Sequence, residues 1–305
     1  MRKQFGIITP AISPFREEGI DDEAVSRLVR YARKIGVRGI FPAGSTGCAP
    51  LMSVEQHIGI IRAYADENVG SMKLFPGIGR NSVSDTLTVA KTAIKAGCDA
   101  VVLVTPYYLL LDRAEITRYY DILLDKIDHD VIVYNIPQLT GNGIDAVMVM
   151  DLRKRHRNLV GVKDSSKNAA GFSELCRLLP EEMLVFQGED DLLLWSLKEG
   201  ASGGVCGTTN FTDLAVRVYD SHASRKAAEA RMLQALLTRV MSAANELAFP
   251  SNYNYLFYRT VMGRGLTNVV PPLAGIADKE GDGAYKRIQG MLNSRKRMYV
   301  SRGRE

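Results

Sequence analysis

The stretch KAGCDAVVLV, from Lys95 to Val104, joins a predicted helix to a predicted strand. A lysine in the last turn of a helix complements the helix dipole, and a glycine just after the helix provides a left-handed cap. The apolar run Ala100–Val104 follows at once and is typical of a short strand that is buried on both faces. The stretch therefore predicts a helix-to-strand junction of a parallel β/α protein.

The same junction occurs again at Lys34–Gly39 and at Lys198–Gly203. Asp21 precedes the helix that ends near Lys34, and Ser82 precedes the helix that ends near Lys95. Both are residue types that cap helix N-termini, and apolar residues at helical spacing follow each of them. The recurrence indicates that helices and strands alternate along the chain.

Short apolar runs rich in Val, Ile and Leu mark the predicted strands. The eight runs are Phe5–Ile8, Gly39–Phe41, Leu74–Phe75, Ala100–Val104, Val131–Tyr134, Val160–Val162, Leu184–Phe186 and Gly203–Val205. Eight parallel units predict an α/β fold, a closed (β/α)8 TIM barrel. The alternative, a doubly wound open sheet, would need a glycine fingerprint after the first strand, and residues 7–15 have none.

The C-terminal part has no further strand signal after Phe211. Helical patterns occur at Ala223–Ala248, Tyr253–Met262 and Asp282–Lys296, and we expect them to provide the eighth barrel helix and a small extension. The predicted domains are a catalytic barrel at residues 1–222 and a helical extension with a basic tail at residues 223–305.

The net charge of +5 is concentrated in that tail. Residues 294–305 contribute four of these charges, so the rest of the chain is close to neutral. A near-neutral body is not typical of a polyanion-binding protein, and we expect no nucleic-acid partner. For the tail, a solvated end is favoured over a nucleic-acid arm. A nucleic-acid arm would predict salt-dependent binding that is lost when the tail is removed.

Composition and cysteine usage are those of a soluble protein. Hydrophobic residues make up 46% of the chain, yet no apolar run is long enough to span a bilayer and the N-terminus has no apolar leader. The four cysteines form no C-x-x-C pair, which favours reduced structural thiols. We expect a cytoplasmic protein with no membrane partner.

The motifs support neither a metal site nor a serine hydrolase site. The four histidines are scattered without the spacing of metal ligands, so we predict no metal site. The segment Gly44–Gly47 is not a G-x-S-x-G elbow, so a Ser–His–Asp hydrolase is not indicated.

Polar residues follow every predicted strand, and in a barrel these strand ends share one rim where active sites lie. Turns and helix caps account for residues such as Asp164 and Asn168. They do not account for Lys163 or Tyr134, which end neighbouring strands. Adjacent strands lie about 4.8 Å apart, so we expect these two side chains to converge.

Lys163 is compatible with three roles on this rim. It would pair with a carboxylate, hold an anion such as phosphate, or lose its proton and condense with a ketone as a nucleophile. Asp164 is expected on the opposite face of the strand, which weakens the first role and leaves the other two open. The glycine run Gly203–Gly207 is open as well, because it suits either phosphate binding near the last two strands or tight packing.

Six motifs fall in the same order along the chain as in a known family. They are Thr9-Pro10, Gly39–Gly47, Thr105–Tyr108, Tyr134–Pro137, Gly161–Asp164 and Gly188–Asp191. In these the sequence resembles the pyruvate-dependent class I aldolases, which include dihydrodipicolinate synthase, N-acetylneuraminate lyase and 2-keto-3-deoxy-sugar-acid aldolases. The resemblance spans nearly the whole barrel and implies a carbon–carbon lyase that uses a covalent Schiff base on Lys163 and no cofactor.

The resemblance also implies a role for each matching residue. Lys163 is the expected Schiff-base lysine, Tyr134 the expected proton relay, and Ser45 the hydroxyl that hydrogen-bonds this tyrosine. Thr46, with the backbone N–H groups of its loop, is the expected site of the pyruvyl carboxylate. Tyr108 matches a tyrosine that reaches into the neighbouring subunit's site, which implies a homo-oligomer, a dimer or a dimer of dimers.

The remaining implied substrate contacts lie around the last strands. Gly188, Asp190 and Asp191 match positions that hold substrate hydroxyls in the sialate lyase branch. Val205 matches an apolar residue of the pyruvate pocket. Gly47 and Ser165 complete the expected substrate-binding set.

Departures from the family pattern favour one branch. Dihydrodipicolinate synthases carry an arginine just after the Tyr-Asn-x-Pro motif, where this chain has the uncharged segment Gln138–Gly141. The loop after Gly47 opens with Cys48 instead of the usual glutamate. Leu111 stands where some archaeal relatives hold a phosphate with an arginine, and Arg113 is two residues further on, which weighs against a phosphorylated substrate.

The sequence therefore predicts a reversible aldolase of the 2-keto-3-deoxygluconate type, which gives pyruvate and a short aldehyde such as glyceraldehyde. Dihydrodipicolinate synthase and N-acetylneuraminate lyase activities remain the alternatives. A non-catalytic sugar-acid sensor on the same scaffold is an interpretation of a different class, and the set Lys163, Tyr134 and Ser45 argues against it.

Overall fold

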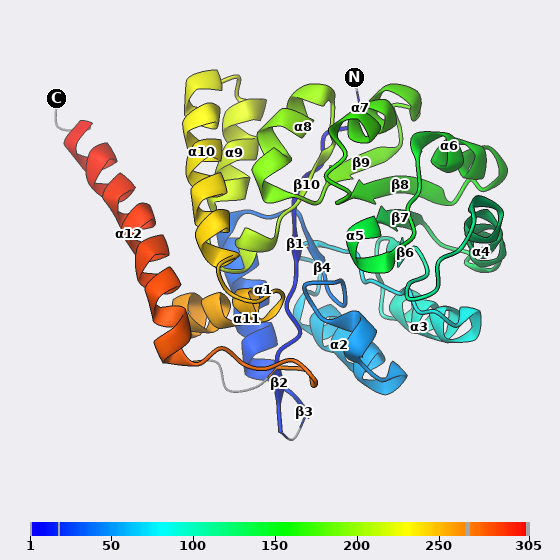
Figure 1. Ribbon diagram of the computed structural model, residues 1–305, viewed down its shortest axis with the longest axis horizontal. Helices are drawn as coiled ribbons and strands as arrows, with labels where there is room; N and C mark the ends of the chain where they lie inside the picture. Colours follow the sequence, from blue (N-terminus) through cyan, green and yellow to red (C-terminus); the bar gives the residue numbers. More distant parts are fainter. Residues whose placement is uncertain (1, 18, 266–268, 303–305) are drawn as a thin grey trace.

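The computed structural model describes residues 2–17, 19–265 and 269–302, with side chains described as far as Ser294. Eight parallel strands form its centre and helices surround them (Figure 1). The strands are β1 (Gly6–Pro10), β4 (Gly39–Phe41), β5 (Lys73–Leu74), β6 (Val101–Val104), β7 (Val131–Asn135), β8 (Leu159–Asp164), β9 (Leu184–Gln187) and β10 (Gly203–Val205). All eight predicted strands are confirmed, with bounds that differ by at most two residues. The small hairpin of β2 (Phe15–Arg16) and β3 (Gly19–Ile20) lies outside this sheet.

The sheet closes on itself. Its edge strands are β5 and β6, and a parallel bridge pairs Gly77, just after β5, with Val102 of β6. The Val102 N–H donates to the Pro76 carbonyl at 2.8 Å, and the Ile78 N–H donates to the Val102 carbonyl at 2.9 Å. The closed ring confirms the predicted (β/α)8 barrel and excludes the open doubly wound sheet.

Eight helices follow the strands around the ring. They are α1 (Asp22–Ile35), α2 (Val54–Glu67), α3 (Val83–Lys95), α4 (Arg113–Lys126), α6 (Ala146–Arg155), α7 (Ala169–Leu178), α8 (Leu193–Glu199) and α9 (Leu214–Ala223). The side chains of Asp21 and Ser82 accept hydrogen bonds from backbone N–H groups of α1 and α3, so both predicted N-caps are confirmed. Gly36, Gly97 and Gly200 have φ values of 87°, 80° and 101°, the left-handed conformation that the recurring junction predicts.

The eighth barrel helix is not where the sequence placed it. It is α9, which ends at Ala223, whereas the helical pattern began there. The neighbours β1, α8 and α10 (Ala227–Ala244) cover α9 on several sides, so its buried residues do not form the one-sided stripe that marks a surface helix. The helix predicted over Ala223–Ala248 is α10, which packs on α9 as the first element of the extension.

The extension continues along one side of the barrel (Figure 1). It contains α11 (Ser251–Phe257), a π-helical turn η4 (Tyr258–Met262) and the long helix α12 (Asp278–Arg302). The backbone of α12 is helical past the predicted end at Lys296. The tail side chains from Arg295 onward lie outside the described ones, so the predicted character of the tail stays a prediction.

The apolar residues form two cores, one on each face of the ring. The inner core, which fills the barrel, includes Ile8, Phe75, Ile132 and Phe186. Tyr134 and Val205 belong to the same cluster and lie at the carboxyl ends of their strands. A larger cluster lies between the strands and the helices. Because the barrel interior is apolar, polar groups that point into the ring gather at the carboxyl ends of the strands.

The described residues bear on two further predictions, which concern membrane spans and cysteines. None of the helices described is long and apolar enough to cross a membrane. All four cysteines are free thiols, in agreement with their predicted reduced state, and Cys48, Cys98 and Cys206 are buried.

Candidate active site

Tyr134 and Lys163 converge as predicted. They are direct partners in the parallel register of β7 and β8, so their side chains leave the sheet on the same face, into the barrel. The Lys163 Nζ lies 3.8 Å from the centroid of the Tyr134 ring and 4.9 Å from that of Phe41. The pair therefore forms one cluster at the carboxyl end of the barrel.

Lys163 is buried without a counter-ion. It is 5% exposed, and within the described residues it has neither an ion pair nor a hydrogen bond. Holding an ammonium group away from water without a carboxylate is costly. The sequence left three roles open for Lys163, and one of them was a structural ion pair. Lys163 forms no such pair with any of the described residues.

The next two residues along these strands point to the opposite face and hold the register. Asn135 donates to the Asp164 carboxylate at 2.6 Å, and the N–H and hydroxyl of Ser166 donate to the other oxygen of the same carboxylate. Burial raises the pKa of Asp164, and these hydrogen bonds oppose that effect. Asp164 thus has the local turn role that was predicted, and Asn168 is confirmed as the N-cap of α7.

The hydroxyl of Tyr134 has a different partner from the predicted one. The Oγ of Ser165 donates to the Tyr134 hydroxyl at 3.4 Å, and no hydrogen bond joins Ser45 to Tyr134 in the described structure. Ser45 and Tyr134 do line the same cavity. Ser165 reaches Tyr134 because it follows β8 directly, whereas Ser45 lies in the loop after β4.

Gly188 makes room for this cluster. A Cβ atom at this position would lie 1.9 Å from the Oγ of Ser165 and 3.1 Å from the Cε of Lys163. Any larger residue would displace the lysine or the serine. The geometric reason for a glycine here is close approach, which is independent of the predicted contact with a substrate hydroxyl.

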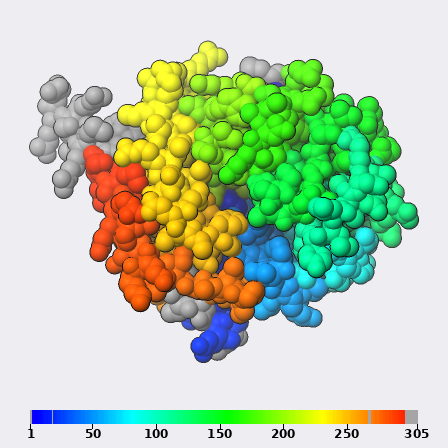
Figure 2. Space-filling model, viewed as in Figure 1, coloured from blue at the N-terminus to red at the C-terminus, as the bar shows by residue number. Residues whose placement is uncertain are grey.

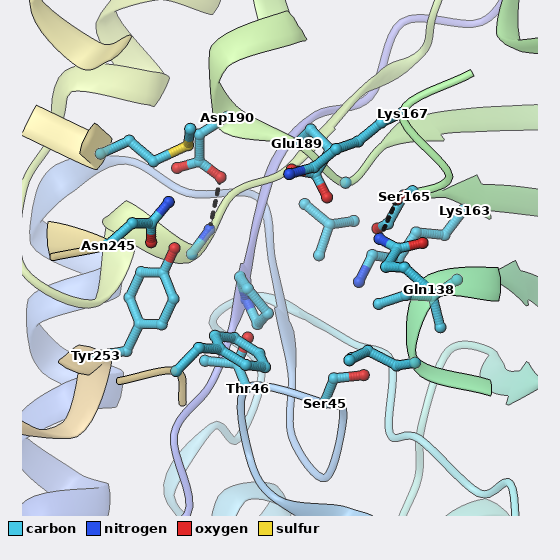
Figure 3. Close-up of a pocket in the computed structure, with 18 of the residues that line it drawn as sticks. Ser45, Thr46, Gln138, Lys163, Ser165, Lys167, Glu189, Asp190, Asn245 and Tyr253 are labelled. Carbon is cyan, nitrogen blue, oxygen red and sulfur yellow. Dashed lines mark hydrogen bonds and ion pairs between the residues drawn. The ribbon is translucent and has the colours of Figure 1, made fainter. Parts of the chain in front are cut away.

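A cavity of about 630 Å³ opens above Lys163. Figure 2 shows the surface hollowed between the green barrel segments and the yellow part of the extension. In Figure 3 Lys163, Ser165 and Gln138 lie on one side of this cavity, Ser45 and Thr46 below, Glu189 and Asp190 above, and Asn245 and Tyr253 opposite. Of the predicted site residues, this cavity brings together Lys163, Tyr134, Ser45, Thr46, Ser165, Gly188, Asp190 and Val205.

The loop after β4 offers hydrogen-bond donors at the base of the cavity. Thr46 is 8% exposed and lines the cavity. Within the described residues, the backbone N–H groups of Thr46 and Gly47 donate no hydrogen bond. Gly47 does not line the cavity, and a Cβ there would lie 2.9 Å from the Ala11 carbonyl oxygen, so its side of the loop is packed against the chain. The free N–H groups suit a small anion.

The whole fold can now be compared with known proteins. A family model described as "Dihydrodipicolinate synthetase family" matches residues 3–289. The chain is 36% identical over 249 residues to a 2-dehydro-3-deoxy-D-gluconate/2-dehydro-3-deoxy-phosphogluconate aldolase of Picrophilus torridus, a match that covers 81% of this chain and 92% of the relative. The chain belongs to the dihydrodipicolinate synthetase family. As a member it is a lyase, a pyruvate-dependent class I aldolase.

Other relatives in the family carry a different activity in their names. A 4-hydroxy-tetrahydrodipicolinate synthase of Chlorobium phaeovibrioides is 33% identical and covers 75% of this chain and 78% of its own. Among solved structures, a 2-keto 3-deoxygluconate aldolase from Picrophilus torridus has a TM-score of 0.83 at 34% identity, covering 89% of this chain and 98% of its own. The 4-hydroxy-tetrahydrodipicolinate synthase from Methylacidiphilum fumariolicum SolV has a TM-score of 0.89 at 28% identity, covering 96% and 98%. Membership in the family thus leaves the second substrate open.

Asp190 lines the cavity of this aldolase, but its carboxylate already accepts hydrogen bonds from other residues of the chain. It accepts hydrogen bonds from the N–H groups of Gly207 and Thr208 and from the Thr208 hydroxyl. Burial raises the pKa of Asp190, and these donors oppose that effect. Asp191 is not among the residues that line the cavity, so its predicted contact with a substrate hydroxyl stays a prediction.

Glu189 and Lys167 form a charged pair at the cavity that the motif assignments did not include. The Lys167 Nζ lies 3.5 Å from a carboxylate oxygen of Glu189, whose side chain is 16% exposed. Burial raises the pKa of Glu189 to about 7, although the Lys167 charge acts in the opposite direction. Glu189 stands inside the motif Gly188–Asp191, so the signal was present, but no role had been attached to it.

The C-terminal extension supplies one wall of the aldolase cavity. Asn245, Phe249 and Tyr253 line it; the first two lie between α10 and α11, and Tyr253 belongs to α11. The Tyr253 ring sits on Gly207, where a Cβ would lie 2.7 Å from the ring carbon that bears the hydroxyl. No sequence pattern pointed to these residues, because they lie far along the chain from the strand ends.

Tyr108 lies on the surface. It is 89% exposed and has a φ of 80°, a conformation that costs energy for a residue with a side chain. The next two residues, Leu109 and Leu110, are 66% and 79% exposed. Three large apolar residues in a row on the surface are typical of a protein–protein contact.

A second, mostly apolar cavity of about 260 Å³ lies beside the first. The two share Ser45, Tyr134, Ile136, Leu139 and Phe249. Cys48, Leu51 and Tyr107 belong to the second cavity alone. Burial raises the pKa of Cys48 to about 12, which makes this thiol a poor nucleophile.

The described residues contain no group of His, Cys, Asp and Glu side chains arranged to hold a metal ion. Three of the histidines have local partners. His57 bonds to the Gly77 carbonyl, His129 to the Cys98 carbonyl, and His156 to the Asp121 carboxylate. These contacts give the three histidines local structural roles.

Proposed function

We propose that Lys163 is the Schiff-base nucleophile of this aldolase and that the substrate is a 2-keto-3-deoxy sugar acid of the 2-keto-3-deoxygluconate type. The observation that carries the proposal is the buried amine of Lys163, which has no ion partner among the described residues and lies against Tyr134 at the edge of a cavity. A lysine with such surroundings has no structural task that would require its charge. Its amine is free to condense with a ketone.

The chemistry follows from the imine. Condensation of the Lys163 amine with the C2 ketone releases water and forms an iminium, which accepts the electron pair of the breaking C3–C4 bond. Tyr134 takes the proton of the C4 hydroxyl, and the aldehyde leaves. The enamine that remains is protonated at C3 and hydrolysed to pyruvate and free lysine. The iminium is itself the electron sink, so we propose that neither a metal nor another cofactor takes part.

Other cavity residues serve binding in this scheme. The free N–H group of Thr46, which lines the cavity, is suited to the pyruvyl carboxylate. Val205 belongs to the apolar inner core beneath and would pack against the pyruvyl methylene. Ser165 and Ser45 both stand near Tyr134, Ser165 through its hydrogen bond and Ser45 as a neighbour in the cavity wall, and each is a candidate to pass the proton on.

The choice of branch is supported by the uncharged wall after β7. Gln138 donates to the Ser165 carbonyl at 2.6 Å, and Leu139 is half exposed, so this wall offers no cation for an aldehyde that carries a carboxylate. Aspartate semialdehyde, the second substrate of dihydrodipicolinate synthase, has such a carboxylate. The 36% identical aldolase of Picrophilus torridus points the same way.

Trapping and substrate ranking test the proposal. Borohydride reduction in the presence of pyruvate should add one pyruvate-derived mass to the chain, on the peptide that contains Lys163. Steady-state cleavage of 2-keto-3-deoxygluconate should then exceed cleavage of N-acetylneuraminate and condensation with aspartate semialdehyde. An unmodified lysine would refute the Schiff-base assignment, and a preference for the semialdehyde would refute the substrate class alone.

We also propose that the enzyme works as a homo-oligomer through the exposed segment Tyr108–Leu110. These three residues would lose their exposed apolar surface in a contact between copies. Light scattering at several concentrations tests this, with Leu109→Ser/Leu110→Ser as the variant. A wild-type chain that stays monomeric at micromolar concentration would refute the proposal.

A further inference from the structure

Glu189 and Lys167 line the aldolase cavity from two neighbouring loops, which follow β9 and β8. The Glu189 N–H donates to the Gln187 side chain at 3.0 Å, which fixes the backbone at this point. Lys167 has a φ of 60°, and such strain in a residue with a side chain is typical of functional sites. In Figure 3 the two side chains lie together at the upper edge of the cavity that Lys163 also lines. Substrate atoms that extend from Lys163 toward these loops would meet the pair.

The carboxylate of Glu189 has unused acceptor positions. Its side chain is 16% exposed, and the Lys167 Nζ at 3.5 Å is its one partner among the described residues. The Lys167 side chain is 64% exposed, so this ion pair is weak. An ionised carboxylate has about four acceptor positions, and burial keeps most water away from these. Donors that a substrate brings would therefore find free acceptors on Glu189.

The other carboxylates that line the cavity already have partners within the chain. Asp190 accepts three hydrogen bonds from the segment after β10. Glu246, just after α10, is paired with Arg287 of α12. Glu189 is therefore the cavity carboxylate that a substrate hydroxyl can reach without breaking hydrogen bonds of the fold.

Two adjacent hydroxyl groups match the charges of this pair. Their hydrogens donate to the carboxylate of Glu189, and their oxygens accept from the ammonium group of Lys167. An apolar tail would take the place of water at both charges without offering either a partner, which is costly. An anionic tail would meet the charge of Glu189, while Lys167 is already neutralised by it.

We propose that Glu189, together with Lys167, binds the two hydroxyl groups of the substrate beyond C4 and so selects a dihydroxy aldehyde over apolar and anionic aldehydes. This inference rests on the proposed function and identifies the residues that recognise the aldehyde half of its substrate. Glyceraldehyde brings these hydroxyls as those of C5 and C6, while its aldehyde carbon becomes C4 of the sugar acid. Glu189 acts by binding alone, and the proton transfers remain with Tyr134.

Condensation of pyruvate with three aldehydes tests the inference. Glyceraldehyde carries both hydroxyls, propanal carries none, and succinic semialdehyde carries a carboxylate. The wild-type enzyme should have its highest kcat/KM with glyceraldehyde. The measured quantities are the ratios of kcat/KM for glyceraldehyde and for succinic semialdehyde to that for propanal. Differences in the intrinsic reactivity of the aldehydes cancel when these ratios are compared between a variant and the wild type.

Glu189→Leu removes the acceptors and should lower the glyceraldehyde ratio by about 30-fold or more, because hydrogen bonds to a charged group are lost. Glu189→Gln keeps a carbonyl acceptor and should lower this ratio by about threefold to tenfold. In both variants the succinic semialdehyde ratio should rise by about tenfold, because Lys167 loses its counter-charge. Adding Lys167→Met to Glu189→Gln should abolish that rise. If Glu189→Leu does not fold, Glu189→Gln decides, with changes of the same sign.

Glu246→Gln is the matched control. It removes a carboxylate from the same cavity, but one that is paired with Arg287, and it should change neither ratio by more than about twofold. A purely structural pair of Glu189 and Lys167 would lower kcat/KM for all three aldehydes by one factor and leave both ratios unchanged. That result would overturn the inference, as would a wild-type enzyme that prefers propanal or succinic semialdehyde.

The borohydride trap separates this inference from the proposed function. A chain that forms the Lys163 adduct with pyruvate, but whose ratios do not respond to the Glu189 variants, contradicts only the role of Glu189. A wild-type chain that forms no adduct with pyruvate contradicts the proposed function itself.

Discussion

Lys163 and Arg2 are both buried cations, and they lie at opposite ends of the barrel. Arg2 precedes β1, and its guanidinium donates four hydrogen bonds to the carbonyl oxygens of Cys176, Leu179, Pro180 and Met183, at 2.6 to 2.9 Å. These carbonyls belong to the end of α7 and to the loop that leads into β9, on the amino side of the strands. Arg2 is 8% exposed and Lys163 is 5% exposed, so their burial is similar.

The difference lies in what surrounds the charge. The guanidinium of Arg2 replaces lost water with carbonyl oxygens, and in doing so it caps the end of α7 and ties the segment before β1 to the barrel. Lys163 replaces water with two aromatic rings and an opening to a cavity. A buried cation with acceptors supports the fold, whereas a buried cation without them is available for chemistry. The predictions below test whether stability and activity separate in this way.

The largest expected effect is the loss of activity in Lys163→Met. Methionine has nearly the shape of lysine without the amine, so the variant should lose about 10⁴-fold or more of kcat/KM and should form no adduct with pyruvate. Its free energy of unfolding should be unchanged or about 1 kcal/mol higher, because an unpaired amine is removed from the interior. Activity assays and chemical denaturation measure the two quantities. A variant that loses several kcal/mol of stability would show that Lys163 supports the fold after all.

Tyr134→Phe should come second. The ring that packs on Lys163 remains and the hydroxyl is lost, so proton transfer suffers and kcat should fall by about 10² to 10⁴-fold. The variant should still form the borohydride adduct if the hydroxyl serves mainly in bond cleavage.

The two serines near Tyr134 can be ranked in the same assay. Ser165→Ala should lower kcat more than Ser45→Ala, because Ser165 is the residue that hydrogen-bonds the tyrosine; the reverse order would restore the original assignment of Ser45.

Arg2→Met should produce the opposite pattern to Lys163→Met. It removes four hydrogen bonds to carbonyls at the amino end of the barrel, and we expect a loss of roughly 2 to 4 kcal/mol in the free energy of unfolding. The values of kcat and KM should not change, because the site lies at the other end. Arg2→Lys is the control: a single ammonium reaches fewer of the four carbonyls and should recover about half of the loss. A variant as stable as the wild type would mean that water serves these carbonyls equally well.

Most of the fold and the centre of the site could be predicted from the sequence, for local reasons. The recurring lysine–glycine junction is written in consecutive residues, and Gly36, Gly97 and Gly200 all have the left-handed conformation that it implies. Lys163 and Tyr134 converge because they end adjacent parallel strands, and adjacency follows from chain order in a barrel. The ordered motifs then led to the family, which the comparisons confirm.

The features that were missed depend on contacts between distant parts of the chain. Asn245 and Tyr253 reach the cavity only because α10 folds back on α9, and nothing local in their sequence records this. The partner of the Tyr134 hydroxyl depends on how the loop after β4 and the end of β8 are placed relative to each other, which a motif does not specify. Whether Asp190 meets a substrate hydroxyl or the N–H groups of Gly207 and Thr208 is a matter of side-chain direction, which a motif does not specify.

Glu189 is an intermediate case, and its pH dependence is the smallest effect that we predict. Its carboxyl is mostly buried like Lys163, but Lys167 gives it a partner as the carbonyls do for Arg2. Burial raises the pKa of Glu189 from 4.5 to about 7, with Asp190 and Asp191 acting in the same direction and Lys167 against it. Between these two pH values the folded chain binds more protons at this site than the unfolded chain does. Stability from this group is therefore present at low pH and lost as the pH rises toward 7.

Glu189→Gln isolates this contribution, because glutamine resembles the protonated acid at every pH. Below pH 4.5 the wild type and the variant should have the same melting temperature, and by pH 8 the variant should be about 2 to 4 °C more stable. Thermal unfolding of both chains across that range in one buffer series measures the difference. A difference that does not change with pH would show that Lys167 compensates the buried charge in full. A difference of opposite sign would place Glu189 with Arg2, among the charged groups that the fold requires.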